Sequence, residues 1–296
     1  MKTSKMALAA VILLAMLASC KSQYESLLNS TDSDQKYEAA FEYFNAGKYQ
    51  KSAKLFESLS QLAGSTSRDD TVQYYLGLSN YRYKDFYTAE TNFTNFIANY
   101  PTSPFVSDAR FLRIDCLYRS TYRYELDQTP SQSALASILE YIHDEPNNIH
   151  LDVCQQMIDD LNERSDRKAL ENARLYYKME DYKASRVAFK NVLKDNAENI
   201  YREDILYYTA MSSYKYASLS IEARQKERYL TFVDDYYTFI SEFDESSRYY
   251  RELNVCYKRA LKALGRYNGS DEDLDIKEKE FEKERKQLEK LAATSN

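Results

Sequence analysis

The sequence has two histidines, five glycines and no tryptophan among its 296 residues. Two histidines are too few for a multi-histidine zinc site, and they argue against most histidine-based acid–base catalysis. The five glycines form no glycine-rich phosphate loop of either standard spacing. We therefore expect no cofactor and no metal, and an enzyme is the weakest interpretation of this chain.

Positive charge and cysteine are also in short supply. The 40 basic residues are outnumbered by 46 acidic ones, which leaves a net charge of −6. Nucleic-acid binding needs a basic stripe, so we expect no nucleic-acid partner. Cys116, Cys154 and Cys256 are too few and too scattered for a disulfide framework. Each lies in a helical pattern and is predicted to be a buried, small apolar residue, with a disulfide pair as the alternative.

An apolar run from Met6 to Ala18 follows two lysines and stops at Cys20. The run is too short for a membrane-spanning helix, which needs about 20 residues, and it has the features of a secretory signal. The segment Leu17-Ala18-Ser19-Cys20 is similar to the bacterial lipobox, in which the cysteine is acylated and becomes the first mature residue. An ordinary signal peptide with a chance cysteine is the alternative. Because lysine rather than aspartate follows Cys20, we expect an outer-membrane lipid anchor that faces the periplasm.

What the chain has in abundance is tyrosine, 29 residues of it, at helical spacing. A pattern of aromatic, small, aromatic and apolar residues recurs along the chain. Its first two copies are 37 residues apart and pair Tyr49 with Phe86, Ser52 with Ala89, Phe56 with Phe93, and Leu59 with Phe96. Further copies centre on Ile138, Phe189 and Tyr236. The small residue lets two antiparallel helices approach closely, and an aromatic just after a tight turn locks the pair.

This pattern resembles the tetratricopeptide repeat, whose nominal period is about 34 residues. The predicted fold is all-α, a tetratricopeptide-like helical hairpin solenoid of about five repeats, with an irregular helical bundle as the alternative. Gly77 and Ala89 stand at the two small-residue contact positions. Ser103 is a candidate N-cap, and residues 129–132 form a candidate capping box.

The predicted organisation has five segments. They are a lipoprotein signal peptide at 1–19, a lipidated linker at 20–32, N-terminal repeats at 33–150, C-terminal repeats at 151–266, and a charged tail at 267–296. The tail is predicted to be a solvated segment, flexible or helical, with a partner-binding helix as the alternative.

Several motifs go beyond a generic repeat. In order after the lipobox they are "YFNAGKYQKSAKLFESL", a second repeat that ends in "YPTSP", "YELDQT" and "YYKMEDYKA". Together they resemble the BamD family of outer-membrane β-barrel assembly lipoproteins, over roughly residues 17 to 250. The family usually has an arginine where this chain has Ala188, and Arg186 lies two residues away on another helix face. A docking salt bridge through that arginine is therefore doubtful.

The resemblance implies a non-enzymatic role in β-barrel assembly. Family members bind the periplasmic domains of the barrel-forming outer-membrane assembly protein and receive unfolded outer-membrane β-barrel substrates. The N-terminal repeats are thought to form the substrate groove, and the C-terminal repeats the docking surface.

The candidate groove is formed by the first helix of each hairpin, which lines the concave side in this repeat type. The inward positions are predicted to be Tyr37, Phe41, Phe44, Tyr74, Leu78 and Tyr81. Rigid aromatic side chains suit an unfolded, apolar segment. The alternative is that these side chains pack between repeats.

The candidate docking residues are Arg202, Glu203 and Asp204, at the start of the fifth repeat. Acidic residues favoured by a helix dipole are the simpler explanation for this trio. Two other binding functions share the compartment: a scaffold for peptidoglycan synthesis or envelope constriction, and a glycan-binding lipoprotein. The missing tryptophan argues against the glycan-binding interpretation.

Overall fold

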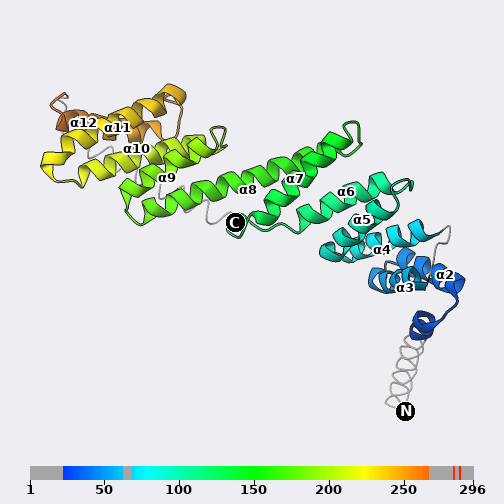
Figure 1. Cartoon of the computed structure of the whole chain (residues 1–296). Coiled ribbons are helices and arrows are strands. Elements are labelled where there is room, and N and C mark those ends of the chain that lie inside the picture. Colours follow the sequence, from blue (N-terminus) through cyan, green and yellow to red (C-terminus); the bar gives the residue numbers. More distant parts are fainter. Residues whose placement is uncertain (1–22, 63–67, 267–282, 284–286, 288–296) are drawn as a thin grey trace, which may run out of the picture. The chain divides into compact units, whose positions relative to one another are not determined.

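The computed structural model describes residues 23–62 and 68–266, together with the single residues 283 and 287, and these are helices and short connections without a strand (Figure 1). Residues 23–29 are helical. The helices that follow are α2 (Ser33–Asn45), α3 (Tyr49–Leu62), α4 (Asp69–Tyr83), α5 (Phe86–Asn99), α6 (Val106–Arg119), α7 (Thr129–Asp144), α8 (Leu151–Lys178), α9 (Tyr182–Asp195), α10 (Arg202–Ser218), α11 (Glu222–Glu242) and α12 (Tyr250–Ala263).

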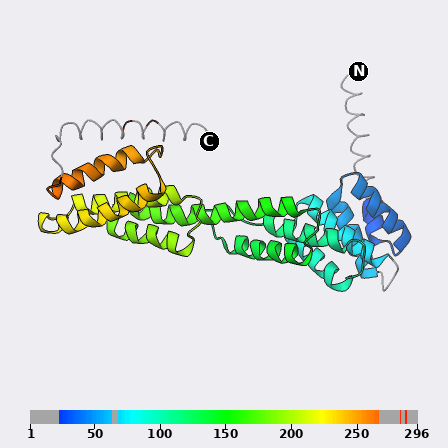
Figure 2. The ribbon, with the colours of Figure 1, turned by 90° about the horizontal axis from the view of Figure 1, so that it is seen from above.

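The chain forms two compact units, which divide between Leu161 and Asn162 inside α8. Successive helices pack on one another from α2 to α7 and from α9 to α12 (Figure 2). Leu170 and Ala173 of α8 pack with Phe189 of α9. Helices α2 to α11 therefore form five successive hairpins, and α12 follows singly. The predicted all-α hairpin solenoid of about five repeats is confirmed. The predicted boundary between residues 150 and 151 falls at the beginning of α8, whereas the unit boundary falls eleven residues later.

The hairpin turns repeat in detail. Gly47, Lys84 and Glu180 occupy the same repeat position, and all three have a left-handed backbone, with φ of 70°, 69° and 60°. An aspartate follows in two of these turns and caps the second helix: Asp85 accepts a hydrogen bond from the Thr88 amide, and Asp181 from the Ala184 amide. The turns therefore confirm the phase read from the aromatic pattern.

The aromatic residue after each turn locks its hairpin, as predicted. Tyr49 contacts Phe44 with ring centroids 5.4 Å apart. The Phe86 and Tyr182 rings contact the preceding helix in the same way, at 5.8 and 5.3 Å.

Small residues bring neighbouring helices together. A Cβ atom built on Gly77 would lie 2.9 Å from the Phe93 ring, and Ala89 is fully buried. Two pairs of buried serines make the same contact in the two units: Ser52 with Ser79 at 3.1 Å, and Ser185 with Ser212 at 2.8 Å. Within each pair, the two hydroxyl groups hydrogen-bond to each other in place of the water that both lose on burial.

The local capping motifs did not predict the first residues of helices α6 and α7. Helix α6 begins at Val106 with Phe105 as N-cap, and α7 begins at Thr129 with Gln128 as N-cap, so both capping predictions are wrong. Ser103 instead donates a hydrogen bond to Asp70 of α4 at 2.8 Å, because contacts between repeats take precedence over the local cap.

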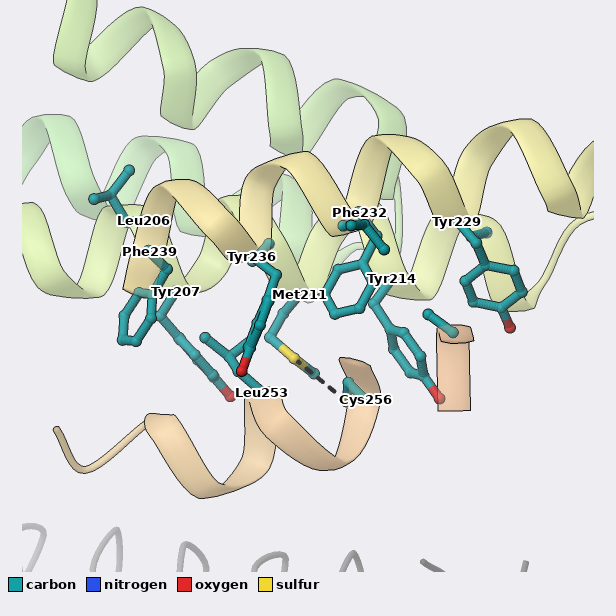
Figure 3. Close-up of a cluster of buried hydrophobic side chains, with 14 residues drawn as sticks. Leu206, Tyr207, Met211, Tyr214, Tyr229, Phe232, Tyr236, Phe239, Leu253 and Cys256 are labelled. Atoms are coloured by element: carbon teal, nitrogen blue, oxygen red, sulfur yellow. Dashed lines mark hydrogen bonds between the residues drawn. The ribbon is translucent and has the colours of Figure 1, made fainter. Parts of the chain in front are cut away.

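The largest apolar cluster joins α10, α11 and α12 (Figure 3). It contains Phe232, Phe239 and Leu253, none of which is exposed, and Cys256 beside Met211. Cys116 and Cys154 are likewise buried, and none of these three cysteines forms a disulfide, so the prediction of three buried thiols is confirmed.

Candidate binding surface on the first helix of each repeat

The predicted groove residues of α2 pack against α4. The Phe41 ring lies 4.6 Å from Tyr75 and 5.1 Å from Phe56, and the Phe44 ring lies 5.3 Å from Tyr75. Tyr37 is half-buried, with the Arg68 guanidinium 5.0 Å from its ring. These side chains seal the contact between the first two repeats and leave only part of each ring to solvent.

The predicted groove residues of α4 pack toward α6. Tyr74 is only 6% exposed, stacks on Phe105 at 4.5 Å, and donates its hydroxyl hydrogen bond to Asp108. Tyr81 donates to Asp115 at 2.7 Å, and Leu78 is half-buried beside the same cluster. Burial first, and then Asp115, raises the pKa of Tyr81 to about 12. Tyr74 therefore has little surface to offer a ligand, whereas Tyr37, Leu78 and Tyr81 keep some.

Similar tyrosine–carboxylate contacts recur along the described chain and join the first helices of neighbouring repeats, or the residue directly before such a helix. We call this set the tyrosine ladder. Besides Tyr74 and Tyr81 it contains the pairs Tyr118–Asp160 at 2.8 Å, Tyr201–Glu163 at 3.0 Å, Tyr207–Glu252 at 2.8 Å, and Tyr249–Asp204. Sequence reasoning missed this use of tyrosine. The signal was present, because Tyr74 and Tyr81 each precede their aspartate by 34 residues.

A hollow of about 580 Å³ lies next to the ladder in the N-terminal unit. Its lining includes Pro104 from the "YPTSP" motif, Asp108 beside Tyr74, Glu145 and His150. The His150 ring stacks on Phe111 with centroids 3.6 Å apart. Proline, an aromatic-backed histidine and carboxylates together make a surface that suits an extended polypeptide with apolar and cationic side chains.

The "LDQT" motif builds the connection between α6 and α7. The buried Gln128 side chain donates to the carbonyls of Arg123 and Leu126 at 2.8 and 3.1 Å, and it accepts from Ser131 at 3.0 Å. Asp127 accepts from the Thr129 amide and hydroxyl. The motif thus links the two ends of the loop by hydrogen bonds, and Leu126 is half exposed at its surface.

The predicted docking residues are engaged within the C-terminal unit. Arg202 pairs with Glu242 of α11 through contacts of 2.5 and 2.7 Å. Glu203 accepts a 2.6 Å hydrogen bond from Ser247, and Asp204 accepts from Arg248 at 2.8 Å and from Tyr249. The trio ties the start of α10 to the end of α11 and to the segment that follows α11. Its role toward a partner stays a prediction.

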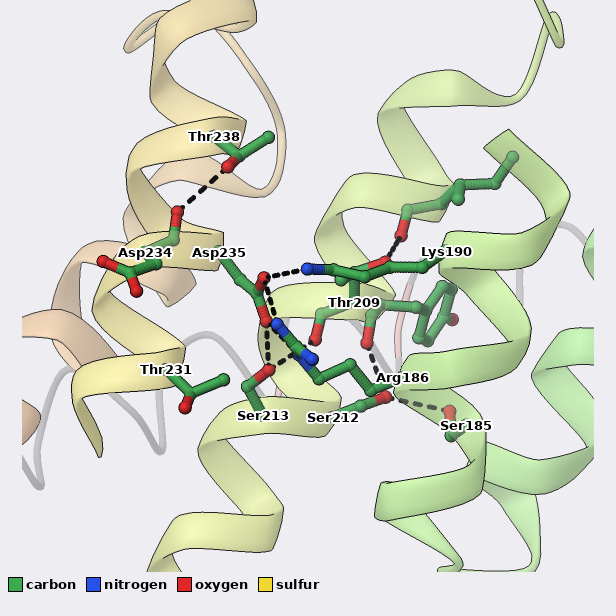
Figure 4. Close-up of polar contacts among 12 residues, drawn as sticks. Ser185, Arg186, Lys190, Thr209, Ser212, Ser213, Thr231, Asp234, Asp235 and Thr238 are labelled. Carbon is green, nitrogen blue, oxygen red and sulfur yellow. Dashed lines mark hydrogen bonds and ion pairs between the residues drawn. The ribbon is translucent and has the colours of Figure 1, made fainter. Parts of the chain in front are cut away.

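Arg186 takes part in a polar cluster between α9, α10 and α11 (Figure 4). Its guanidinium lies 2.9 Å from Asp235, which also contacts Lys190 at 3.0 Å and the Ser213 hydroxyl. Asp235 is only 4% exposed, so these two cations and the hydroxyl compensate its lost hydration. Ala188 packs beside the Phe189 cluster. Arg186 therefore has a stabilising role inside the unit.

The remaining sequence predictions concern the lipid anchor, the charged tail, metal binding and membrane-spanning helices. Cys20, the predicted signal peptide and all but two residues of the predicted tail lie outside the described residues. Within the described parts of the chain, no three histidine, cysteine, aspartate or glutamate side chains gather as a metal site would require. In the same parts, no helix combines the length and the apolar character needed to cross a membrane.

The fold and its repeated contacts define a tetratricopeptide-like helical-repeat protein. The chain belongs to the YfiO family of outer membrane lipoproteins, whose family model matches residues 29–232. No curated protein matches the chain.

Two solved structures are similar at 14% identity each. One is a thermophilic TPR protein of Thermus thermophilus; the match covers 78% of this chain and 99% of that one, with a TM-score of 0.30. The other is the C-terminal part of a TPR repeat-containing protein of Cytophaga hutchinsonii; the match covers 88% and 93% respectively, with a TM-score of 0.32.

Proposed function

We propose that this protein is a non-enzymatic component of outer-membrane β-barrel assembly. It binds the periplasmic domains of the barrel-forming assembly protein and receives unfolded outer-membrane β-barrel proteins, while a lipid on Cys20 holds it at the membrane. The observation that carries the proposal is the match to the YfiO outer membrane lipoprotein family over residues 29–232. The "YPTSP" and "LDQT" motifs, which form a hollow and a fixed loop in the N-terminal unit, support it.

The test is purification of the membrane-anchored protein in mild detergent, followed by identification of the proteins recovered with it. We expect stoichiometric recovery of a barrel-forming outer-membrane protein. A Cys20→Ala variant is the control for the anchor. Recovery of peptidoglycan synthases or glycan-import proteins in its place would contradict the proposal and favour a scaffold or a glycan-binding role.

The substrate groove is tested by substituting predicted groove residues whose side chains are partly exposed to solvent. We expect a Tyr37→Ala, Leu78→Ala double variant to bind a peptide copying the C-terminal strand of an outer-membrane barrel at least tenfold more weakly, about 1.4 kcal/mol. The control is Tyr87→Ala, because Tyr87 is 82% exposed on α5, the second helix of its hairpin. Unchanged affinity in a folded double variant would remove the groove from the proposal.

Docking through Arg202 is tested by exchanging a charge pair. Arg202→Glu alone breaks the contact with Glu242, so its effect on a partner would be ambiguous. The Arg202→Glu, Glu242→Arg double variant keeps an internal pair and moves the positive charge to α11. If Arg202 docks the barrel component, co-purification is lost in the double variant. If co-purification persists, Arg202 serves only the fold.

A further inference from the structure

A second hollow of the N-terminal unit lies where α4 meets α3 and α5, the second helices of two hairpins. Its volume is about 250 Å³, and we call it the α3–α5 hollow. Helix α4 contributes Leu76, Asn80 and Tyr83 to its lining. At about 100° per residue, these three positions lie on the side of α4 opposite to the three predicted groove residues of that helix. The α3–α5 hollow is therefore separate from the predicted substrate groove.

Three carboxamide side chains from three different helices line this hollow. They are Gln50 of α3, Asn80 of α4 and Asn92 of α5, and none of them has a hydrogen-bond partner among the described residues. The Asn92 amide nitrogen is buried. A buried donor without a partner lowers stability, and most buried donors in native proteins are paired. The unpaired Asn92 amide thus marks a place where a ligand can supply the acceptor.

The two charged side chains of the lining that are free to bind a ligand have opposite signs. Lys54 and Glu57 are both exposed, and neither forms an ion pair with the described residues. Asp85 is already engaged, because it caps α5. Ala53 and Leu76 add an apolar part to the lining and are buried. The hollow therefore combines unpaired polar groups with a small apolar surface and selects no particular charge.

The chemistry of the three carboxamides matches a polypeptide main chain. A carboxamide carries N–H donors and a carbonyl acceptor, as a peptide group carries one of each. Along each edge of an extended polypeptide, unpaired N–H and C=O groups alternate. Three unpartnered carboxamides around one hollow can therefore pair with such an edge whatever side chains it carries. The hollow is smaller than the roughly 300–1,000 Å³ of small-molecule pockets, which suits a short stretch of a longer chain.

We propose that the α3–α5 hollow binds the main chain of an extended polypeptide, independently of its sequence, through Gln50, Asn80 and Asn92. The predicted groove on the other side of α4 offers contacts to aromatic and apolar side chains, so the two surfaces recognise different parts of a polypeptide. This site does not depend on the proposed function. A polypeptide edge whose N–H and C=O groups are paired here cannot pair with a second unfolded chain.

The first test uses the full-length protein in mild detergent and a fluorescent eight-residue peptide of alanine, serine and threonine with blocked ends. We expect saturable binding by fluorescence anisotropy, with an affinity that changes less than threefold when the side chains are replaced by valine, lysine and glutamate. In an extended chain, the N–H groups of alternate residues point to the same edge. N-methylation of one alternating set should therefore weaken binding at least tenfold, and N-methylation of the other set should not. Equal effects of the two sets, or no saturable binding of the parent peptide, would overturn the proposal.

The second test substitutes the carboxamides. We expect Asn80→Leu with Asn92→Leu to bind the peptide at least tenfold more weakly without a lower urea midpoint, because leucine replaces an unpaired buried donor by an apolar group of similar shape. Asn99→Leu, at the exposed end of α5, is the matched control. The Tyr37→Ala, Leu78→Ala groove variant should bind this peptide normally, which separates a failure of this proposal from a failure of the proposed function. Unchanged affinity in a folded Asn80→Leu, Asn92→Leu variant would show that the peptide binds elsewhere and would refute the site.

Discussion

Two residues show how strictly the hairpin turn constrains the backbone. Lys84 and Glu180 adopt the left-handed conformation that glycine takes at position 47. For a residue with a side chain this conformation costs about 1–2 kcal/mol, and glycine relieves that cost at the expense of some entropy in the unfolded chain. Both residues are exposed, so their side chains contribute no packing.

We therefore expect Lys84→Gly to raise the free energy of unfolding by about 0.5–1 kcal/mol, measured by urea denaturation. Lys84→Ala is the control, since it removes the same side chain and keeps the backbone penalty. Equal stability of the two variants would show that this turn is not strained.

At Gly77, in contrast, the lack of a side chain is required by close packing and not by the backbone conformation. Alanine is preferred over glycine inside a helix by about 1 kcal/mol, but a Cβ here would lie 2.9 Å from the unexposed Phe93 ring. Since the Phe93 ring is fully buried and would have to shift, we expect Gly77→Ala to lower the free energy of unfolding by about 1–2 kcal/mol. Adding Phe93→Leu should recover part of the loss, and a Gly77→Ala variant as stable as the parent would contradict the predicted clash.

At the scale of elements, the tyrosine ladder joins helices that are not sequence neighbours. The Tyr81 hydroxyl of α4 donates to Asp115 of α6, which also accepts a contact from Arg119. The neutral hydroxyl is the form that the fold stabilises, because the pKa of Tyr81 rises from its ordinary value of 10 to about 12. Its contribution to stability is present below pH 10 and is lost as the pH rises to about 12.

We expect Tyr81→Phe to lower the free energy of unfolding at neutral pH by about 1–2 kcal/mol and to flatten its decline between pH 10 and 12. Tyr87→Phe is the control, because Tyr87 is 82% exposed. Chemical denaturation at a series of pH values makes the comparison. An unchanged slope would mean that the hydroxyl contributes nothing to the pairing of the two helices.

Contacts within a hairpin could be predicted from the sequence, whereas the tyrosine ladder between hairpins could not. The aromatic and small residues around Tyr49 and Phe86 fixed the hairpins, because contacts within a hairpin are close in sequence and recur at one spacing. The partners of Tyr74 and Tyr81 depend on how first helices stack, which a single repeat does not encode. The six groove positions predicted from the sequence therefore include Tyr74, which is buried between helices.

At the scale of the whole molecule, the two compact units carry separate buried thiols. Cys116 and Cys154 lie in the N-terminal unit, and Cys256 lies in the C-terminal unit. Repeat arrays lose structure locally where neighbouring contacts are weak. Thiol labelling against denaturant concentration thus measures the stability of each unit within the intact chain.

We expect Asp235→Asn to move the labelling midpoint of Cys256 to lower denaturant, by about 2–3 kcal/mol, because Arg186 and Lys190 lose their shared counter-charge. Cys116 and Cys154 should keep their midpoints. Asp234→Asn, one residue away on the exposed side of α11, is the control. A parallel shift of all three cysteines would show that the chain unfolds as one cooperative body.

The tyrosine ladder has an optical consequence, because the chain contains no tryptophan. Its ultraviolet emission comes from tyrosine alone, and a tyrosine hydroxyl bonded to a carboxylate emits weakly. Excited at the long-wavelength edge of aromatic absorption, this protein is nearly dark. Outer-membrane barrels carry girdles of aromatic residues at the membrane interfaces. Under the proposed function, a barrel segment that contains tryptophan would be the sole tryptophan emitter in the mixture, so its binding can be measured by fluorescence without a label.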